Sequence, residues 1–247
     1  MFLMVMATSK LLGQRFELTG FSVELGGGPL AKNRSMTMDN INASLKNEPF
    51  IPSAMFKEEK IRFYSSPGYY FGYFLRFTDG KNKPSQKLWT LGLAFNSIDN
   101  NYSHSIYNDL SDTIYSFTIE EDRACINLVI EKLLLTRKLS KRVFFDAGLG
   151  GSLGYTYLST YQFYENTYLR QDFELLLRQY KKAPLHNELL LNEYLLVGIK
   201  FRGKQHLEVG GFVKGGLLQS VSIPGASNYG YILFGMLKVS WAFHKAP

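Results

Sequence analysis

The sequence predicts an all-β protein, a single eight-stranded antiparallel up-and-down transmembrane β-barrel with short periplasmic turns and long extracellular loops. Three observations predict it. Eight segments alternate large apolar residues with small or polar ones, short and long connections follow them in turn, and their charged residues share the small-residue side. Glycine (22) and tyrosine (16) are abundant among the 247 residues, which favours strands and turns. No apolar run approaches the roughly 18 residues that a membrane-spanning helix needs.

Each predicted strand passes a period-2 test, because successive side chains of a strand point to opposite faces. In 143–157, VFFDAGLGGSLGYTY, the odd positions are mostly bulky and the even positions are mostly glycine, serine or acid. The fourth strand fits least well because Leu133 and Leu135 break the parity, and a segment within 103–120 is its alternative. The eight predicted strands are 20–28, 68–77, 88–96, 125–135, 143–157, 194–201, 207–216 and 229–243.

The connections alternate in length along the chain. Short turns follow the second, fourth and sixth strands, at 78–86, 137–141 and 202–205. The other links are 28–60, 97–122, 159–187 and 219–228. A membrane barrel whose termini lie in the periplasm has this alternation of short periplasmic turns and longer extracellular loops.

The long link 159–187 has two interpretations. Five apolar residues follow helical spacing and predict an amphipathic helix that caps the barrel or docks a partner, namely Leu169, Phe173, Leu176, Leu177 and Tyr180. Phe173, Leu175 and Leu177 equally suit a strand that extends beyond the membrane.

The bulky face of the strands is expected to meet lipid. The interior of an eight-stranded barrel is only just wide enough for side chains to fill, so bulk on the inside would overpack it. A continuous apolar belt facing water is equally unfavourable. We therefore predict a lumen network of four acids and four bases on the small-residue side: Glu24, Arg76, Glu131, Asp146, Lys200, Glu208, Lys214 and Lys238.

Aromatic residues near the strand ends predict a lipid-facing girdle, because amphipathic rings favour the headgroup level of a membrane. Three of them fall near the short-turn end, namely Trp89, Trp241 and Phe243. Four fall near the long-loop end, namely Tyr155, Tyr157, Tyr229 and Tyr231.

These features together resemble the small outer-membrane β-barrel family of diderm bacteria, the OmpA- and OmpX-type barrels. The resemblance covers nearly all of the chain after Gln14. The last strand, YILFGMLKVSWAF, is similar to the C-terminal assembly signal of the family and ends in the aromatic Phe243, although HKAP follows here. The resemblance implies an integral outer-membrane protein in contact with outer-membrane lipid, and it identifies no enzyme subfamily.

The first residues predict export. Residues 1–13, MFLMVMATSKLLG, resemble the hydrophobic and cleavage regions of a secretory signal peptide without the usual cationic start. We expect 1–13 to be a truncated signal peptide and 14–247 to be the barrel domain.

Charge and cysteine content exclude other classes of function. The net charge is +7, but the basic residues are scattered, which argues against a nucleic-acid partner. The single cysteine, Cys125, rules out an internal disulfide and a cysteine-based metal site. No metal or cofactor motif is present, so no cofactor is expected.

The preferred function is therefore non-enzymatic: a barrel that presents surface loops or serves as a subunit of an envelope complex with other envelope proteins. One alternative is an outer-membrane enzyme acting on lipid A or phospholipid, with His104 beside Ser103 and Ser105 as a candidate base. Another is a secreted soluble lipocalin-like barrel, with the apolar parity turned inward around a ligand. No catalytic residue is assigned.

Overall fold

The fold is all-β and antiparallel, with a seven-residue helix among the described residues. The computed structural model describes residues 16–32, 35–46, 49–50, 61–62, 64–65, 67–79, 88–108, 111–171, 174–203, 206–222 and 227–243. The elements, in chain order, are β1 (Phe16–Lys32), β2 (Ser35–Met36), α2 (Met38–Ser44), β3 (Ile61–Arg62), β4 (Tyr64–Ser65), β5 (Pro67–Asp79), β6 (Leu88–Asn108), β7 (Thr113–Lys138), β8 (Val143–Leu169), β9 (Leu175–Pro184), β10 (Glu188–Arg202), β11 (Leu207–Ser222) and β12 (Ser227–Ala242).

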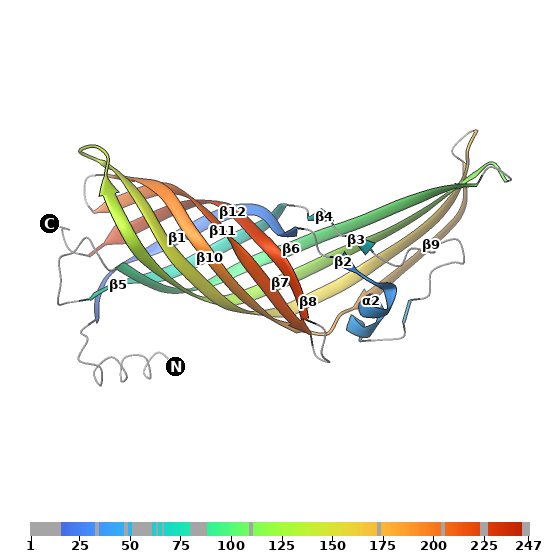
Figure 1. Ribbon diagram of the computed structural model, residues 1–247, viewed down its shortest axis with the longest axis horizontal. Coiled ribbons are helices and arrows are strands. Elements are labelled where there is room, and N and C mark those ends of the chain that lie inside the picture. The colour runs from blue at the N-terminus through green and yellow to red at the C-terminus, as the bar shows by residue number, and fades with distance from the viewer. Residues whose placement is uncertain are drawn as a thin grey trace.

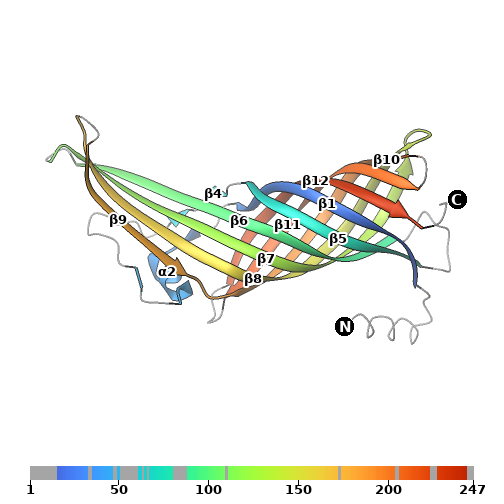
Figure 2. The same ribbon diagram turned by 180° about the vertical axis from the view of Figure 1, so that it is seen from behind.

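Eight of the described strands pair in a ring over part of their length (Figures 1 and 2). The ring runs β1, β5, β6, β7, β8, β10, β11, β12 and back to β1, and every neighbouring pair is antiparallel. Val23 of β1 lies opposite Val239 of β12 on one side and Tyr73 of β5 on the other. The first and last strands of the ring are therefore hydrogen-bonded to each other.

Beyond the ring, β6, β7 and β8 continue as an open sheet. Tyr155 of β8 pairs with Leu189 of β10, whereas Thr160 pairs with Pro184 of β9, so β9 replaces β10 as the neighbour of β8. We call residues 98–108, 113–123, 158–169 and 175–184 the extension, and Figure 1 shows it projecting to the right of the ring. The opposite end of the ring, where β7 turns into β8 at 139–142, is the short-turn end.

Side chains of the ring alternate between buried and exposed. Phe71, Leu153 and Val239 point outward and are 45%, 50% and 38% exposed. Lys238 points inward and is 9% exposed. A lipocalin-like barrel, the alternative with the apolar parity around an internal ligand, requires the opposite orientation of these side chains.

The outward face changes from apolar to polar where the ring gives way to the extension. On β7 the outward side chains include Ile126, Leu128 and Ile130 in the ring; in the extension they are Ile114, Ser116, Thr118, Glu120 and Asp122, four of which are polar. Asp99 of β6 pairs with Asp122 at this boundary, where partial burial and the charge of Asp122 raise the pKa of Asp99. The same strands therefore carry an apolar outward face in the ring and a mostly polar outward face in the extension.

The inward face of the extension carries a second apolar core, which α2 covers. Thr37 caps the helix by accepting a hydrogen bond from the Asn40 backbone. The Asn42 side chain bonds both backbone groups of Phe50, whose ring stacks on Phe163 at 4.3 Å. The buried members of this core are Ile41, Leu45, Phe50, Ile61, Tyr102, Tyr115, Phe117, Ile119, Tyr161, Phe163, Ala183 and Leu185.

Two segments that the sequence analysis treats as long loops are largely strands. The predicted loop 97–122 lies in the β6–β7 hairpin, and most of 159–187 belongs to β8 and β9. In β8 an extra residue at Tyr157 reverses the parity of the strand, after which Tyr161 and Phe163 point inward. The alternation used to predict the strand therefore stops at this residue. Large side chains at the odd positions no longer alternate onto the outward face beyond Tyr157, but β8 stays hydrogen-bonded to β7 as far as Leu169.

The helical interpretation of 159–187 is wrong for the residues described. Leu176 and Tyr180 lie on the exposed strand β9, as do Leu175 and Leu177, while Phe173 lies outside the described residues. The core under the extension is instead covered by α2, from the preceding link 28–60. β9 is held as a strand because it pairs with β8 along its length.

The uncertain fourth strand lies within β7. Both 125–135 and 113–120 belong to this strand, and 103–108 belongs to β6. The register with β8 shifts between Leu133 and Leu135, so that Leu133 packs on the inner core while Leu134 and Leu135 are exposed. This bulge explains the broken parity.

We expect Phe50→Ala to loosen α2 from the extension, because removing a buried aromatic ring costs about 3–5 kcal/mol. Hydrogen–deuterium exchange of the α2 amides should accelerate, while amides of the ring strands keep their protection. Tyr180→Ala, on the outward face of the extension, is the control and should leave α2 exchange unchanged. Unchanged α2 exchange in Phe50→Ala would contradict this role of Phe50.

Candidate functional site

The centre of the ring holds two lysines and two glutamates, which we call the central cluster: Glu24, Glu131, Lys214 and Lys238. Lys214 Nζ lies 2.7 Å from Glu24 Oε2 and also pairs with Glu131. Lys238 Nζ lies 2.7 Å from Glu24 Oε1 and 3.5 Å from Glu131 Oε2. Tyr194 and Thr90 donate hydrogen bonds to Glu131 at 2.9 and 3.1 Å. The neighbouring strands β11, β12 and β1 are thus tied to β7 on the other side of the ring.

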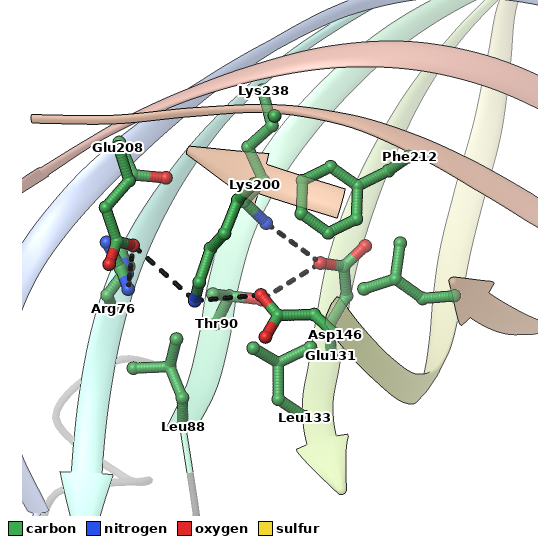
Figure 3. Close-up of a pocket in the computed structure, with 13 residues that line it drawn as sticks. Arg76, Leu88, Thr90, Glu131, Leu133, Asp146, Lys200, Glu208, Phe212 and Lys238 are labelled. Carbon is green, nitrogen blue, oxygen red and sulfur yellow. Dashed lines mark hydrogen bonds and ion pairs between the residues drawn. The ribbon is translucent and has the colours of Figure 1, made fainter. Parts of the chain in front are cut away.

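A second group, the basal cluster, lies toward the short-turn end and consists of Arg76, Asp146, Lys200, Arg202 and Glu208. Figure 3 shows all of these residues except Arg202. Glu208 accepts from Arg76 Nη2 at 3.1 Å and from Arg202 Nε at 3.0 Å. Lys200 Nζ lies 2.8 Å from Asp146 Oδ2 and 3.6 Å from Glu208 Oε2. Glu208 therefore has contacts on both of its oxygens.

A third group, the junction cluster, lies where the ring meets the extension. Arg123 of β7 pairs with Glu121 on its own strand and with Glu188 at the start of β10. Asn100 and Tyr161 donate hydrogen bonds to Glu121 at 2.6 and 3.2 Å. All three charged groups are buried, so the junction is closed by ion pairs rather than by apolar packing alone.

Glycines make room for aromatic rings between these clusters. A Cβ atom at Gly150 would overlap the ring of Tyr194, and one at Gly198 would overlap the ring of Phe212. Lys214 Nζ lies 5.0 Å from the ring centre of Tyr70 and 5.2 Å from that of Tyr194, within cation–π range. The small residues of the inward face thus belong to a packed interior in which rings and ion pairs share the space.

The structure brings together the residues of the sequence-predicted lumen network. Glu24, Glu131, Lys214 and Lys238 form the central cluster, and Arg76, Asp146, Lys200 and Glu208 belong to the basal cluster. Sequence reasoning missed Arg202, which lies one residue beyond the predicted strand. It also missed the junction cluster, because 121–123 and 188 lie outside the predicted strands 125–135 and 194–201. The sequence does contain a signal for these residues, because Glu121 and Arg123 have the same parity as Cys125, whose side chain points inward.

The residues predicted as an aromatic girdle lie on the outward face where their side chains are described. Tyr155, Tyr157, Trp241 and Phe243 are exposed, and Trp89 is half-buried with Lys132 Nζ 4.7 Å above its ring. The side chains of Tyr229 and Tyr231 lie outside the described part of the structure.

One acid lies on the outward face among apolar residues. Glu193 of β10 is exposed, with Leu191 and Leu195 as its outward neighbours on the same strand. It pairs across the sheet with Gly151 and Leu217. A charge at this position is unfavourable in lipid but not in water, so substitution of Glu193 can show which of the two surrounds the ring.

The candidate enzyme residues do not converge. His104 lies opposite Phe117 on the β6–β7 ladder, and its ring stacks with the inward Tyr102. Ser103 and Ser105 occupy the exposed positions of the other face, because successive residues of a strand alternate. The buried thiol of Cys125 is free.

Across the described ranges, no three histidine, cysteine, aspartate or glutamate side chains are arranged to hold a metal ion. Within the same part of the chain, no helix is long and apolar enough to cross a membrane.

No protein-family model matches the chain, and no curated protein is significantly similar to it. The site is therefore interpreted from its own geometry.

We expect Gly150→Ala to lower the free energy of unfolding by about 1–3 kcal/mol, because the added methyl group displaces the Tyr194 ring that bonds Glu131. Denaturant titration of the refolded protein measures this change. Gly211→Ala is the matched control, since a Cβ there meets nothing within 4 Å, and its effect should stay within about 0.5 kcal/mol. Equal effects at both positions would contradict the close packing of Tyr194 against β8.

Proposed function

We propose that the ring is an eight-stranded transmembrane β-barrel of the bacterial outer-membrane type, and that it holds the extension outside the membrane as a non-enzymatic binding platform. In this proposal the short-turn end faces the periplasm and the extension faces the exterior. Outer-membrane lipid surrounds the ring, and other envelope proteins are the partners of the extension.

The observation that carries this proposal is the inverted polarity of the ring. Charged side chains are buried and paired inside, whereas large apolar side chains are exposed outside. We call the exposed apolar set the outer belt; it includes Leu25, Phe71, Tyr73, Leu93, Phe95, Ile130, Leu149, Leu153, Leu195, Val197, Ile199, Val213, Leu237 and Val239. A continuous belt of this kind is unfavourable in water and suits a hydrocarbon surrounding.

The height of the outer belt supports the same proposal. On β7 the outward residues are apolar between Asp122 and Lys132, which are separated by nine residues. A tilted transmembrane strand needs about 9–11 residues. The polar outward face of the extension begins at Asp122, as expected if the strands leave the hydrocarbon there.

The packed interior supports an anchoring role over free conduction. Tyr194, Phe212 and the central cluster occupy the middle of the ring, and the junction cluster closes the end toward the extension. Eight strands leave only enough interior for side chains. The extension is not needed to close the barrel, and in the proposed function it is the part that binds partners.

Cysteine labelling of intact cells tests this arrangement. We expect Ser105→Cys, on the exposed face of the extension, to react with a membrane-impermeant maleimide on whole cells. Ser140→Cys, in the exposed turn at the other end, should react only after the outer membrane is permeabilised. The native Cys125 is buried and serves as the unlabelled background. Equal labelling of both variants on whole cells, or recovery of the protein in the aqueous fraction without detergent, would reject the proposal.

Glu193→Leu tests lipid contact directly. A charged side chain on the lipid face is unfavourable, by an amount that depends on its depth, so this substitution should raise the unfolding free energy in phospholipid vesicles by about 1–2 kcal/mol. Glu174→Leu, at the exposed β8–β9 turn, is the control and should change it by less than about 0.5 kcal/mol. No gain from Glu193→Leu in vesicles would argue that this face is not in lipid.

A further inference from the structure

We propose that the basal cluster binds a small monovalent anion, of the size of chloride or formate, through the unpaired nitrogens of Arg76. The site is a pocket at the short-turn end of the lumen. Its charged lining residues are Arg76, Glu131, Asp146, Lys200, Glu208 and Lys238 (Figure 3). The inference goes beyond the proposed function and does not depend on what surrounds the ring.

Arg76 carries the argument because two of its donor nitrogens have no partner. The residue is 8% exposed, and its Nη2 donates to Glu208 at 3.1 Å. Its Nε and Nη1 are buried without a hydrogen-bond partner. Buried guanidinium donors without a partner are costly, and in folded proteins such groups usually contact water or an ion.

The acids near Arg76 accept no hydrogen bond from its Nε or Nη1, and their oxygens already have other partners. Glu208 receives Arg202 on Oε1, and Arg76 Nη2 and Lys200 on Oε2. Asp146 pairs with Lys200 through Oδ2 and accepts a hydrogen bond from Thr136 on Oδ1 at 2.7 Å. An acceptor for Arg76 must therefore come from outside this set.

The charge balance of the basal cluster favours an anion as that acceptor. The charged side chains that line the pocket are balanced, with three cations and three carboxylates. Arg202, which pairs with Glu208 from outside this lining, adds one positive charge to the basal cluster. The central cluster next to it is balanced, with two lysines and two glutamates. A monovalent anion neutralises the excess, whereas a divalent anion would reverse it.

The walls of the pocket set the size of the anion. Leu88, Leu133, Leu196 and Phe212 form its apolar walls, and Ser240 adds a hydroxyl group. The empty space is about 380 Å³ with the open mouth included, and the enclosed part of the pocket holds little more than a water-sized group. Chloride, bromide and formate fit this description, and large organic anions do not.

Thermal unfolding of the refolded full-length protein in different sodium salts tests the proposal. At equal ionic strength, we expect chloride or formate to raise Tm above the value in gluconate, by about 5 °C once the anion is near a hundredfold above its Kd. General screening of charges acts in every salt and so cancels in this comparison. Acetate, which is larger than formate, shows whether the pocket admits a longer carboxylate.

Two variants separate the site from the surface charge of the protein. Arg76→Lys retains the positive charge but loses the Nε and Nη1 donors, and it should lose the difference between chloride and gluconate. Arg142→Gln removes an exposed arginine at the same end and should keep that difference in full. The proposal is overturned if Arg76→Lys responds like the unmodified chain, or if the unmodified chain has the same Tm in both salts.

Bromide provides a measurement that needs no variant, in case Arg76→Lys does not refold. Crystals of the unmodified protein grown in bromide should show an anomalous peak within about 3.5 Å of Arg76 Nε or Nη1. Water at that position with no anomalous signal would show that solvent alone satisfies Arg76, and would reject the anion site. Neither result bears on the cysteine labelling, so the two proposals fail independently.

Discussion

The small interior of an eight-stranded ring is the constraint on which the rest of the structure depends. Such a ring leaves space for little more than its own inward side chains. Gly150 and Gly198 lack a Cβ where the rings of Tyr194 and Phe212 cross the interior. The alternation of bulk and glycine along β8 therefore has two causes, an outward face that accepts large side chains and an inward face already filled by rings from neighbouring strands.

The same constraint requires the charged groups to be paired. Water has little access to the centre of the ring, so an unpaired Lys214 or Glu131 would lose its hydration without compensation. Lys214 meets two carboxylates and two tyrosine rings, and Lys238 meets the same two carboxylates. Buried ion pairs add little net stability, but they strongly disfavour any register in which one partner is missing. They therefore fix which face of each strand points inward.

The strands β6 to β8 have side chains of different polarity in the ring and in the extension. In the ring the outward side chains are largely apolar and the interior combines ion pairs with aromatic and aliphatic side chains. In the extension the outward side chains of β6 to β8 are mostly polar and the inward ones form an apolar core. The change happens over a few residues, at the extra residue Tyr157 on β8 and beside the ion pairs of Arg123 on β7. With α2 covering its inward face, the extension has its own apolar core, and this separation of cores supports a barrel that anchors and an extension that binds.

The sequence by itself determined the parts that depend on local alternation. The all-β class follows from period-2 patterns, and the charged residues brought together in the central and basal clusters follow from parity. Only the tertiary structure decided the rest, for a physical reason in each case. The extent of β6 to β9 depends on pairing between strands, which continues after the outward face turns polar. The junction cluster joins Glu121 and Arg123 to Glu188, which is 65 residues from Arg123 and reaches it only through the ring. The unpaired nitrogens of Arg76 depend on which acids its neighbours already occupy, and that is set by distances across the lumen rather than by spacing along the chain.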